Sequence, residues 1–375
     1  MLQSAALGGQ ARLTLGLGLA VLIGFVAYVG RGVLIPFVVA GFLCFLIFTL
    51  KESVKRIPVI GRYCPAWFSY LVAFAIIISG FIVFAEIIKS NVEALIAAAP
   101  LYEARLRELT QSALHWLESV AILPEDFVGG VDQLRRTALS MINPLLSEVG
   151  GSARALTSNF VTIFLYTAFM IVERGRIFKK INMLSTNADD RRAVNETIAD
   201  IGAMVRQYIT VKTLTNLVTA GVGYIILRLV GVDFAGFWAL LIFVLNFIPI
   251  IGAISAITLP VILALIQPEG GGVKTALLAL GLLVAAEQTM SSVIEPRLIG
   301  RSLNLSPLVI LLSLAVWGSL WGFAGLLLSV PITVTAMIIL TQFPTTRPIA
   351  VLLSDTGRIA EIKHPHTAPE AAGGD

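Results

Sequence analysis

Long apolar stretches separated by short charged segments make up most of the chain. Several run for about 18 or more nearly uncharged residues, the length at which an α-helix crosses a bilayer. Two further apolar regions, 234–267 and 306–342, are interrupted by prolines and glycines. The uninterrupted stretches predict spanning helices at 12–30, 33–50, 67–88, 155–173, 209–230 and 273–291.

The composition agrees with this pattern. Hydrophobic residues make up 57% of the 375 residues and charged residues 13%, and the mean hydropathy is +0.89. Soluble domains are about half apolar and about a quarter charged. A membrane β-barrel would show short alternating segments, which the sequence lacks. We therefore predict an all-α polytopic membrane protein with about six full transmembrane helices.

Basic residues in short loops predict the orientation. The loop KESVKRIPVIGR and the segment after residue 173 are rich in Lys and Arg, which favours the cytoplasmic side. Both termini are then cytoplasmic and 89–150 lies outside. The net charge of +4 gives no indication of nucleic-acid binding, because these residues sit between spans. The predicted units are 1–88 with three spanning helices, an extracytoplasmic helical insert 89–150, a fourth span 151–173, a cytoplasmic amphipathic linker helix 174–208, a transport core 209–345 and a polar cytoplasmic tail 346–375.

The predicted outer insert carries an apolar seam. From Val92 to Val120 its apolar residues are spaced alternately by three and four, which is typical of a helix that packs against a partner. The partner is either a second amphipathic stretch at 131–145 or another subunit. Pro100 is expected to kink or offset the first helix. The apolar spacing at 198–209 predicts a helix that continues into the fifth span.

The interrupted region 234–267 contains the motif NFIPIIG. Each arm beside the motif is shorter than the roughly 20 residues that a spanning helix needs. Pro249 removes a backbone donor and Gly252 permits a tight reversal. Backbone groups freed inside a membrane must be buried in protein or line a watery cavity. The region is therefore predicted to be a re-entrant hairpin, although two short crossings would leave the same topology.

The region 306–342 repeats this device around a WG-x-x-WG-x-x-G centre. With 234–267 entering from outside and 306–342 from inside, the two predicted re-entrant hairpins have opposite orientations. Opposed, interrupted segments are typical of transporters, with the site close to their tips. The tryptophans fit either an interfacial anchor or a site, and the glycines favour close helix packing.

Polar side chains occur close to these elements. Asn246 lies beside the first predicted tip, and Glu287 and Gln288 interrupt an apolar span. An ionisable residue at that depth is a functional candidate, since it can exchange a proton or pair with a cation. A solvated position at the cytoplasmic end of the span is the alternative for Glu287. Glu295 is expected in a loop, paired with Arg297 or Arg301.

Other chemistry has little support in the sequence. The two cysteines and three histidines form no metal-binding or redox motif, and no nucleotide-binding loop is present. No nucleophile, base and orienting group can be assembled, so an enzyme is not expected. We predict no cofactor, no metal and no nucleic-acid partner.

Three motifs resemble one known family. NFIPIIG, EPRLIGRSLNLSPL and WGSLWGFAGLLLSVP are similar to the C-terminal half of the autoinducer-2 exporter family of bacterial inner-membrane permeases, and the order of elements resembles it over about residues 10–345. The positions that match its motifs are Asn246, Pro249, Gly252, Glu295, Pro296, Gly300, Pro307, Trp317, Gly318, Gly322, Gly325 and Pro331. Glu287, Gln288 and Trp321 complete the candidate path for substrate or ion.

The resemblance implies a secondary-type carrier in the bacterial inner membrane that exports a small molecule, such as the autoinducer-2 quorum-sensing signal. It also implies a homo-oligomer, for which a pentamer is the expected assembly. Exchange of sodium or lithium for protons is an alternative within the same class. A membrane scaffold without transport, which recruits partners through its helical segments, is the alternative from another class.

Overall fold

The computed structural model describes residues 9–55, 65–119, 159–177, 179–180, 183, 188–299, 304–343 and 345–357. In these ranges the regular structure is helical, apart from an isolated bridge between Leu305 and Ser354. The predicted all-α membrane architecture is confirmed, whereas the predicted number of crossings remains a prediction. By length and composition, five described helices suffice to cross a membrane: Arg31–Glu52, Trp67–Ser112, Val194–Val230, Val273–Leu298 and Pro307–Thr341.

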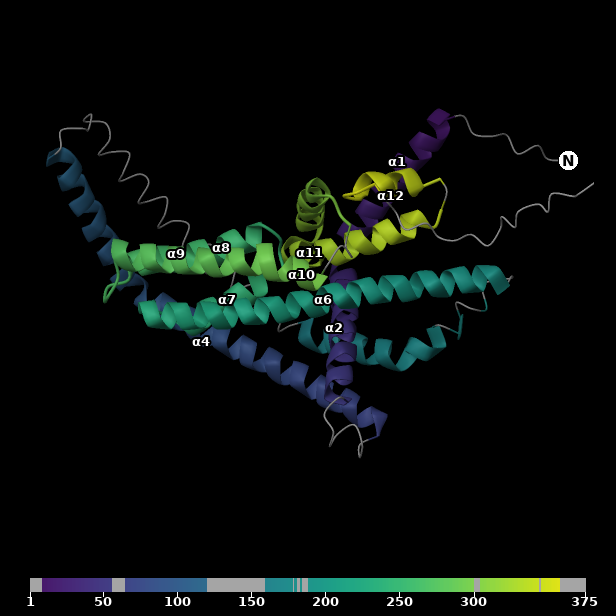
Figure 1. The fold of residues 1–375 in the computed structure, drawn as a ribbon, viewed down its shortest axis with the longest axis horizontal. Coiled ribbons are helices and arrows are strands. Elements are labelled where there is room, and N and C mark those ends of the chain that lie inside the picture. Colours follow the sequence, from purple (N-terminus) through teal and green to yellow (C-terminus); the bar gives the residue numbers. More distant parts are fainter. Residues whose placement is uncertain are drawn as a thin grey trace, which may run out of the picture.

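The first two helices are not packed as an antiparallel pair. α1 (Gly9–Val29) and α2 (Arg31–Lys55) meet at Gly30, whose N–H donates to the Val26 carbonyl at 2.8 Å. In Figure 1, α1 rises to the upper edge of the view while α2 descends across α6. The sequence predicted spans at 12–30 and 33–50, and in the structure the two helices join at Gly30.

The long helix α4 (Ala66–Ser119) crosses the predicted boundary between membrane and insert at residue 88 without interruption. α4 contains Pro100, and Figure 1 shows the helix changing direction toward its C-terminal end. A proline inside a helix removes a hydrogen bond and commonly bends it. The second amphipathic stretch predicted for the insert, 131–145, lies outside the described residues.

The apolar seam of α4 packs against the core of the same chain. Val92 and Tyr102 are buried in one hydrophobic cluster with residues of α6, α7, α8 and α9. The Tyr102 hydroxyl also donates to Asp233 Oδ2 at 2.8 Å. Val92 and Tyr102 thus pack on the core of their own chain, a partner that the spacing did not indicate. A second insert helix and another subunit remain predictions for the rest of the seam.

α6 (Ala188–Val230) is the long element beside which the core assembles. From residue 188 it runs through the second part of the predicted linker and the predicted fifth span as one helix, which agrees with the predicted continuation into that span. Val205 and Ile209 are buried against α11, so this stretch packs on protein. The helix at 159–177 packs against α4 through phenylalanines, with Phe160 4.8 Å from Phe81 between ring centroids.

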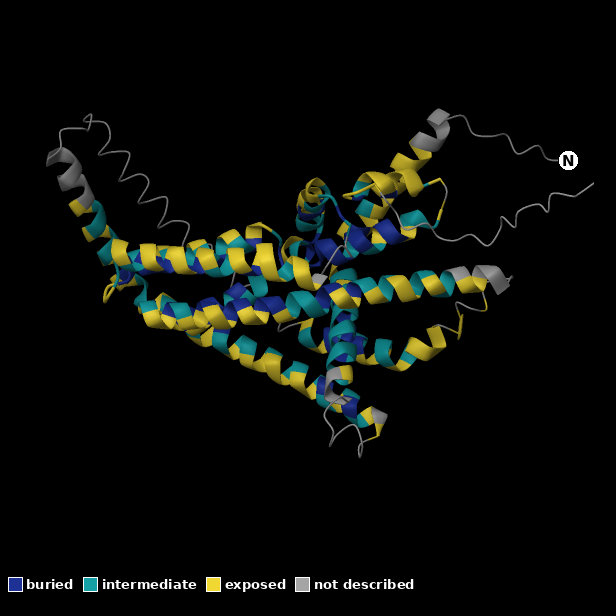
Figure 2. Cartoon of the chain, viewed as in Figure 1, coloured by how far each residue is buried: buried dark blue, intermediate teal, exposed yellow. Residues whose placement is uncertain are grey.

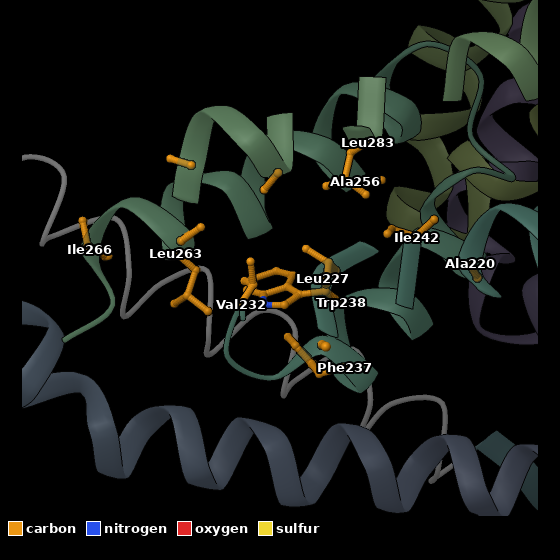
Figure 3. Close-up of a cluster of buried hydrophobic side chains, with 14 of the residues drawn as sticks. Ala220, Leu227, Val232, Phe237, Trp238, Ile242, Ala256, Leu263, Ile266 and Leu283 are labelled. Atoms are coloured by element: carbon orange, nitrogen blue, oxygen red, sulfur yellow. The ribbon is translucent and has the colours of Figure 1, made fainter. Parts of the chain in front are cut away.

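Two antiparallel helices form the first interrupted region. α7 (Ala235–Leu245) and α8 (Ile251–Ile266) contact each other and lie beside α9 (Val273–Thr289). Figure 3 shows Trp238 and Ile242 of α7 among the apolar side chains shared by these helices and α6. Residues of α7 are buried on several sides, because neighbouring helices surround it.

Gln267 joins the two ends of this hairpin. Its side chain is fully buried, its Nε2 donates to the Gly231 carbonyl at 2.8 Å, and its Oε1 accepts from the Asp233 N–H at 3.1 Å. The ends of α7 and α8 therefore lie at the same end of the bundle. At 1.5 Å per residue, α7 is about 16 Å long, which is shorter than the roughly 30 Å of a hydrocarbon core.

The second interrupted region also folds back on itself. α11 (Pro307–Thr341) consists of two helical arms that meet at Gly322, where φ is 59° and ψ is −137°. A Cβ added at Gly325 would lie 1.8 Å from the Trp317 carbonyl oxygen. In a straight helix these residues would be about 12 Å apart along the axis. A hairpin built on glycine explains this approach.

The chain beyond residue 345 is not wholly a free tail. α12 (Arg347–Leu353) contacts α11, and the Ser306 N–H donates to the Leu353 carbonyl at 3.1 Å. The two ends of the α11 hairpin are thus held together by the segment that follows it. The part of the predicted polar tail from 358 to 375 lies outside the described residues.

The outer faces of the helices are apolar. Figure 2 shows exposed positions along α9 and along α4. Leu277 and Leu278 of α9 are exposed, as is Ile82 of α4, and α1 exposes nearly all of its described apolar side chains. A membrane protein presents such surfaces to lipid, whereas water-exposed apolar surface of this extent is rare on soluble monomers.

Candidate functional site

The turn between α7 and α8 carries a buried amide. Asn246 ends α7, its backbone N–H bonds the Ile242 carbonyl, and only 5% of the residue is exposed. Its Nδ2 donates to Glu287 Oε2 of α9 at 2.8 Å. The hairpin tip and the neighbouring helix are therefore joined by a polar contact inside an otherwise apolar core.

Backbone strain is concentrated at the same tip. Ile250 has φ 64° and ψ −63°, and the Ile251 N–H bonds the Pro249 carbonyl at 2.7 Å. This is the γ-turn with positive φ, which is rare and strained. Strained conformations persist where the surrounding structure enforces them, and they cluster at functional sites. Pro249 and Ile250 thus mark the tip as a place where conformational energy is stored.

Gly252 allows the start of α8 to lie directly against the end of α7. A Cβ at this position would lie 1.8 Å from the Leu245 carbonyl oxygen, so a larger residue forces the two arms apart. The tip is also fixed to α6, because Asn216 Nδ2 donates to the Phe243 carbonyl at 3.1 Å. Asn216 lies 14 residues before Val230, which places it about 21 Å along α6 from that end.

A partly buried ion pair lies close to the Asn246–Glu287 contact. Lys212 Nζ of α6 donates to both carboxylate oxygens of Glu295 at 2.8 and 2.9 Å. The two side chains are 12% and 18% exposed. α6 contacts both α9 and α10, so the ion pair and Glu287 lie on adjoining elements. With both carboxylates ionised, this polar cluster of Asn246, Glu287, Lys212 and Glu295 carries one surplus negative charge.

The surplus charge falls on Glu287. The Lys212 ammonium is bound by Glu295 in a bidentate contact, whereas Glu287 receives a neutral amide donor from Asn246. A partly buried carboxylate without a cationic partner is costly to keep ionised. Chemically, the site can take up a proton, a cation or a hydrogen-bonding group of a polar solute.

Glu295 differs from its sequence interpretation. It is not in a loop: it is the first residue of α10 (Glu295–Ile299), and its partner is Lys212 rather than an arginine of its own segment. Arg301 lies outside the described residues. Lys212 was not among the predicted site residues, because the predicted site lay in and beside the interrupted regions. A lysine inside a predicted span was the signal that identifies it.

The remaining predicted residues take different positions. Gln288 is exposed and accepts from the Ser291 hydroxyl at 3.5 Å, so it faces away from the Asn246 contact. Gly300 lies outside the described residues. Pro307 begins α11, and Pro331 lies within its second arm. Within the described ranges, no group of three or more His, Cys, Asp or Glu side chains could hold a metal ion.

The tip of the second hairpin contacts α1. Trp321 Nε1 donates to the Ala27 carbonyl at 2.9 Å, and the Trp317 and Trp321 rings have centroids 5.2 Å apart. Gly318 faces Leu326, with which an added Cβ would collide at 2.7 Å. Gly318, Gly322 and Gly325 thus shape this hairpin. The indole of Trp321 therefore binds the first helix rather than the polar cluster.

The fold defines a polytopic helical membrane protein, and the polar cluster beside a hairpin tip is its candidate site. The chain belongs to the AI-2E family of transporters, because the profile described as "AI-2E family transporter" matches residues 17–345. This agrees with the resemblance seen in the sequence. Members of this family are transport proteins rather than enzymes.

Two of the following relatives match most of the chain, and the third matches less than half of it. The AI-2 transport protein TqsA of Escherichia coli K12 is 28% identical over 354 residues, which are 92% of this chain and 97% of that protein. A putative transport protein of Haemophilus influenzae is 29% identical over 350 residues, 92% and 96% of the two chains. The putative transport protein YhhT of Escherichia coli K12 is 37% identical over 149 residues, 40% and 42% of the two chains.

Proposed function

We propose that this transporter exports a small polar molecule from the cell, with autoinducer-2 as the first candidate, and that the polar cluster is its site. The name of the TqsA relative supports the candidate. The observation that carries the proposed site is the Asn246–Glu287 hydrogen bond, which joins a strained hairpin tip to α9. A solute that competes for this bond can free the tip.

The arrangement of the two hairpins supports a carrier. In the proposed topology α7 and α8 enter from outside, the α11 arms enter from inside, and both termini are in the cytoplasm. α7 and α8 have 11 and 16 residues, fewer than the roughly 20 that a membrane-spanning helix needs. These lengths favour a re-entrant hairpin over paired short crossings. A bacterial inner membrane and a pentameric assembly remain part of the proposal on the strength of the family resemblance.

An efflux measurement tests this function. Cells that produce the parent protein should release autoinducer-2 faster than cells with an empty vector, at matched membrane levels. Asn246→Ala and Glu287→Ala should reduce the excess efflux by at least about tenfold, since each removes a partner of a buried polar contact. Glu86→Ala, which removes an exposed carboxylate of α4, is the matched control and should behave like the parent.

Two outcomes contradict the proposal in different ways. Parent cells that release no more autoinducer-2 than the empty vector would reject this substrate. Normal efflux by both Asn246→Ala and Glu287→Ala would reject the site while leaving the substrate in place. Loss of efflux in Glu86→Ala as well would point to a general defect rather than to the cluster.

The surplus carboxylate favours a second candidate function, the exchange of a monovalent cation for a proton. Glu287 is the group that would carry either ion, because Lys212 is engaged by Glu295. In everted vesicles with an imposed pH gradient, added sodium or lithium should dissipate the gradient. Glu287→Gln keeps the hydrogen-bonding shape but lacks the charge, so it should abolish that response. A response equal to the parent would reject Glu287 as the exchanging group.

A further inference from the structure

A π-helical turn separates the two carboxylates of the cluster. Residues Met290–Ile294 form the π-helix η1, between α9 and α10, and the Glu295 N–H bonds the Met290 carbonyl five residues earlier. Residues eight apart in a regular α-helix differ in direction by about 80°, at 3.6 residues per turn. A π turn holds one residue more than an α turn, which brings Glu287 and Glu295 close to one face.

Proline chemistry explains why the turn lies here. Pro296 has no N–H and its ring crowds the carbonyl four residues earlier, so a regular α-helix is disfavoured across Ser292 and Pro296. Local π turns are one way in which membrane helices accommodate proline. Pro296, a position of the family motif, therefore supplies a cause for the register that directs both carboxylates to the same side.

The two glutamates contact different elements from this shared face. Glu295 binds Lys212 on α6, and Glu287 binds Asn246 at the hairpin tip. We infer that the Lys212–Glu295 ion pair positions Glu287 for the hairpin tip, acting through the π turn between the two glutamates. Lys212 and Glu295 are thus positioning residues. The inference rests on the proposed function only for its effect on transport.

Energetics distinguish the positioning of Glu287 from a purely local contact between α10 and α6. Removing one partner of a buried ion pair leaves an uncompensated charge and is strongly destabilising. If the ion pair only held α10 against α6, the structural change caused by removing one partner would be confined to the surroundings of residue 295. If the pair sets the register of the segment, Glu287 turns away and the tip loses the bond to Asn246. Ile248, which is 2% exposed beside Asn246, then becomes accessible.

The experiment measures thiol labelling of Ile248→Cys in a background of Cys44→Ser and Cys64→Ser. A small maleimide is applied to the purified, full-length protein in lipid nanodiscs. Lys212→Gln and Glu295→Gln should each raise the labelling rate by about tenfold. The charge swap, Lys212→Glu together with Glu295→Lys, should return the rate toward the parent. Arg297→Gln, on the exposed side of α10, is the matched control and should leave the rate unchanged.

A second variant tests the π turn itself. Pro296→Ala lets the segment become regular and should raise the labelling of Ile248→Cys in the same direction. Parent rates in Lys212→Gln and Glu295→Gln would overturn the inference. So would an equal rise in Arg297→Gln, which indicates general loosening, or a charge swap that labels as fast as the single variants.

Efflux separates this inference from the proposed function. Glu295→Gln should lower autoinducer-2 efflux in the parent background but have no further effect when Glu287→Gln is already present. An additional loss in that background contradicts positioning through Glu287. Since labelling needs no substrate, a protein that exports no autoinducer-2 can still show the predicted labelling pattern, and then only the substrate assignment fails.

Discussion

At the scale of single residues, glycine decides whether each hairpin can close. Gly252→Ala places a methyl group where the Leu245 carbonyl oxygen lies within 1.8 Å, so the tip must open. We expect a loss of about 2 kcal/mol or more in stability, as for other substitutions that overpack a tight contact. Thermal unfolding of the detergent-solubilised protein measures it.

Gly236→Ala is the control for that prediction. Gly236 lies in α7 of the same hairpin and has open space around it, so alanine there should stabilise the helix by about 0.5–1 kcal/mol. An equal melting temperature for Gly252→Ala and the parent would show that the two arms of the hairpin are less tightly packed at Gly252 than the contacts indicate.

The scale of elements shows what the sequence could predict. Pro249 and Gly252 interrupt an apolar region that is too short for two full membrane-spanning helices. The effects of proline and glycine on the backbone are local, so they can be predicted from a single sequence. Glu287 was also predicted as a candidate, because a carboxylate in a span is conspicuous, and the structure places it in contact with Asn246. The amphipathic seam of α4 was read correctly as a packing face, but its partner depends on tertiary structure, which no spacing of Val92 and Tyr102 can give.

Other elements depend on contacts between distant segments. The Lys212–Glu295 pair joins residues 83 positions apart, so neither side chain indicates the other. The π turn arises from a shift of one residue, which hydrophobic spacing cannot resolve. α1 and α2 were expected as neighbouring spans, and the structure adds that helical hydrogen bonding continues across Gly30 between them. Sequence therefore predicts helices and breaks better than it predicts their partners.

At the scale of the whole molecule, α4 links the predicted outer segment to the predicted transport core. Tyr102 donates to Asp233 in the loop between α6 and α7, and Asp233 in turn donates its N–H to Gln267 at the end of α8. This chain of contacts fixes the base of the hairpin whose tip carries Asn246. A substitution in α4 should therefore weaken the contacts at the base of the hairpin, although α4 is far from the hairpin tip in the sequence.

Tyr102→Phe tests this link, because it deletes the hydroxyl and keeps the ring. We expect a loss of about 1 kcal/mol, the usual net value of one hydrogen bond, and a lower melting temperature by about 2 °C for a chain of this size. Tyr224→Phe, on the exposed side of α6, should melt with the parent. Faster thiol labelling of Ile248→Cys in Tyr102→Phe would show that loosening the base reaches the tip, whereas an unchanged rate would confine α4 to a structural role at the base. Equal melting of Tyr102→Phe and the parent would contradict the link, since the Asp233 carboxylate would then gain nothing from the tyrosine.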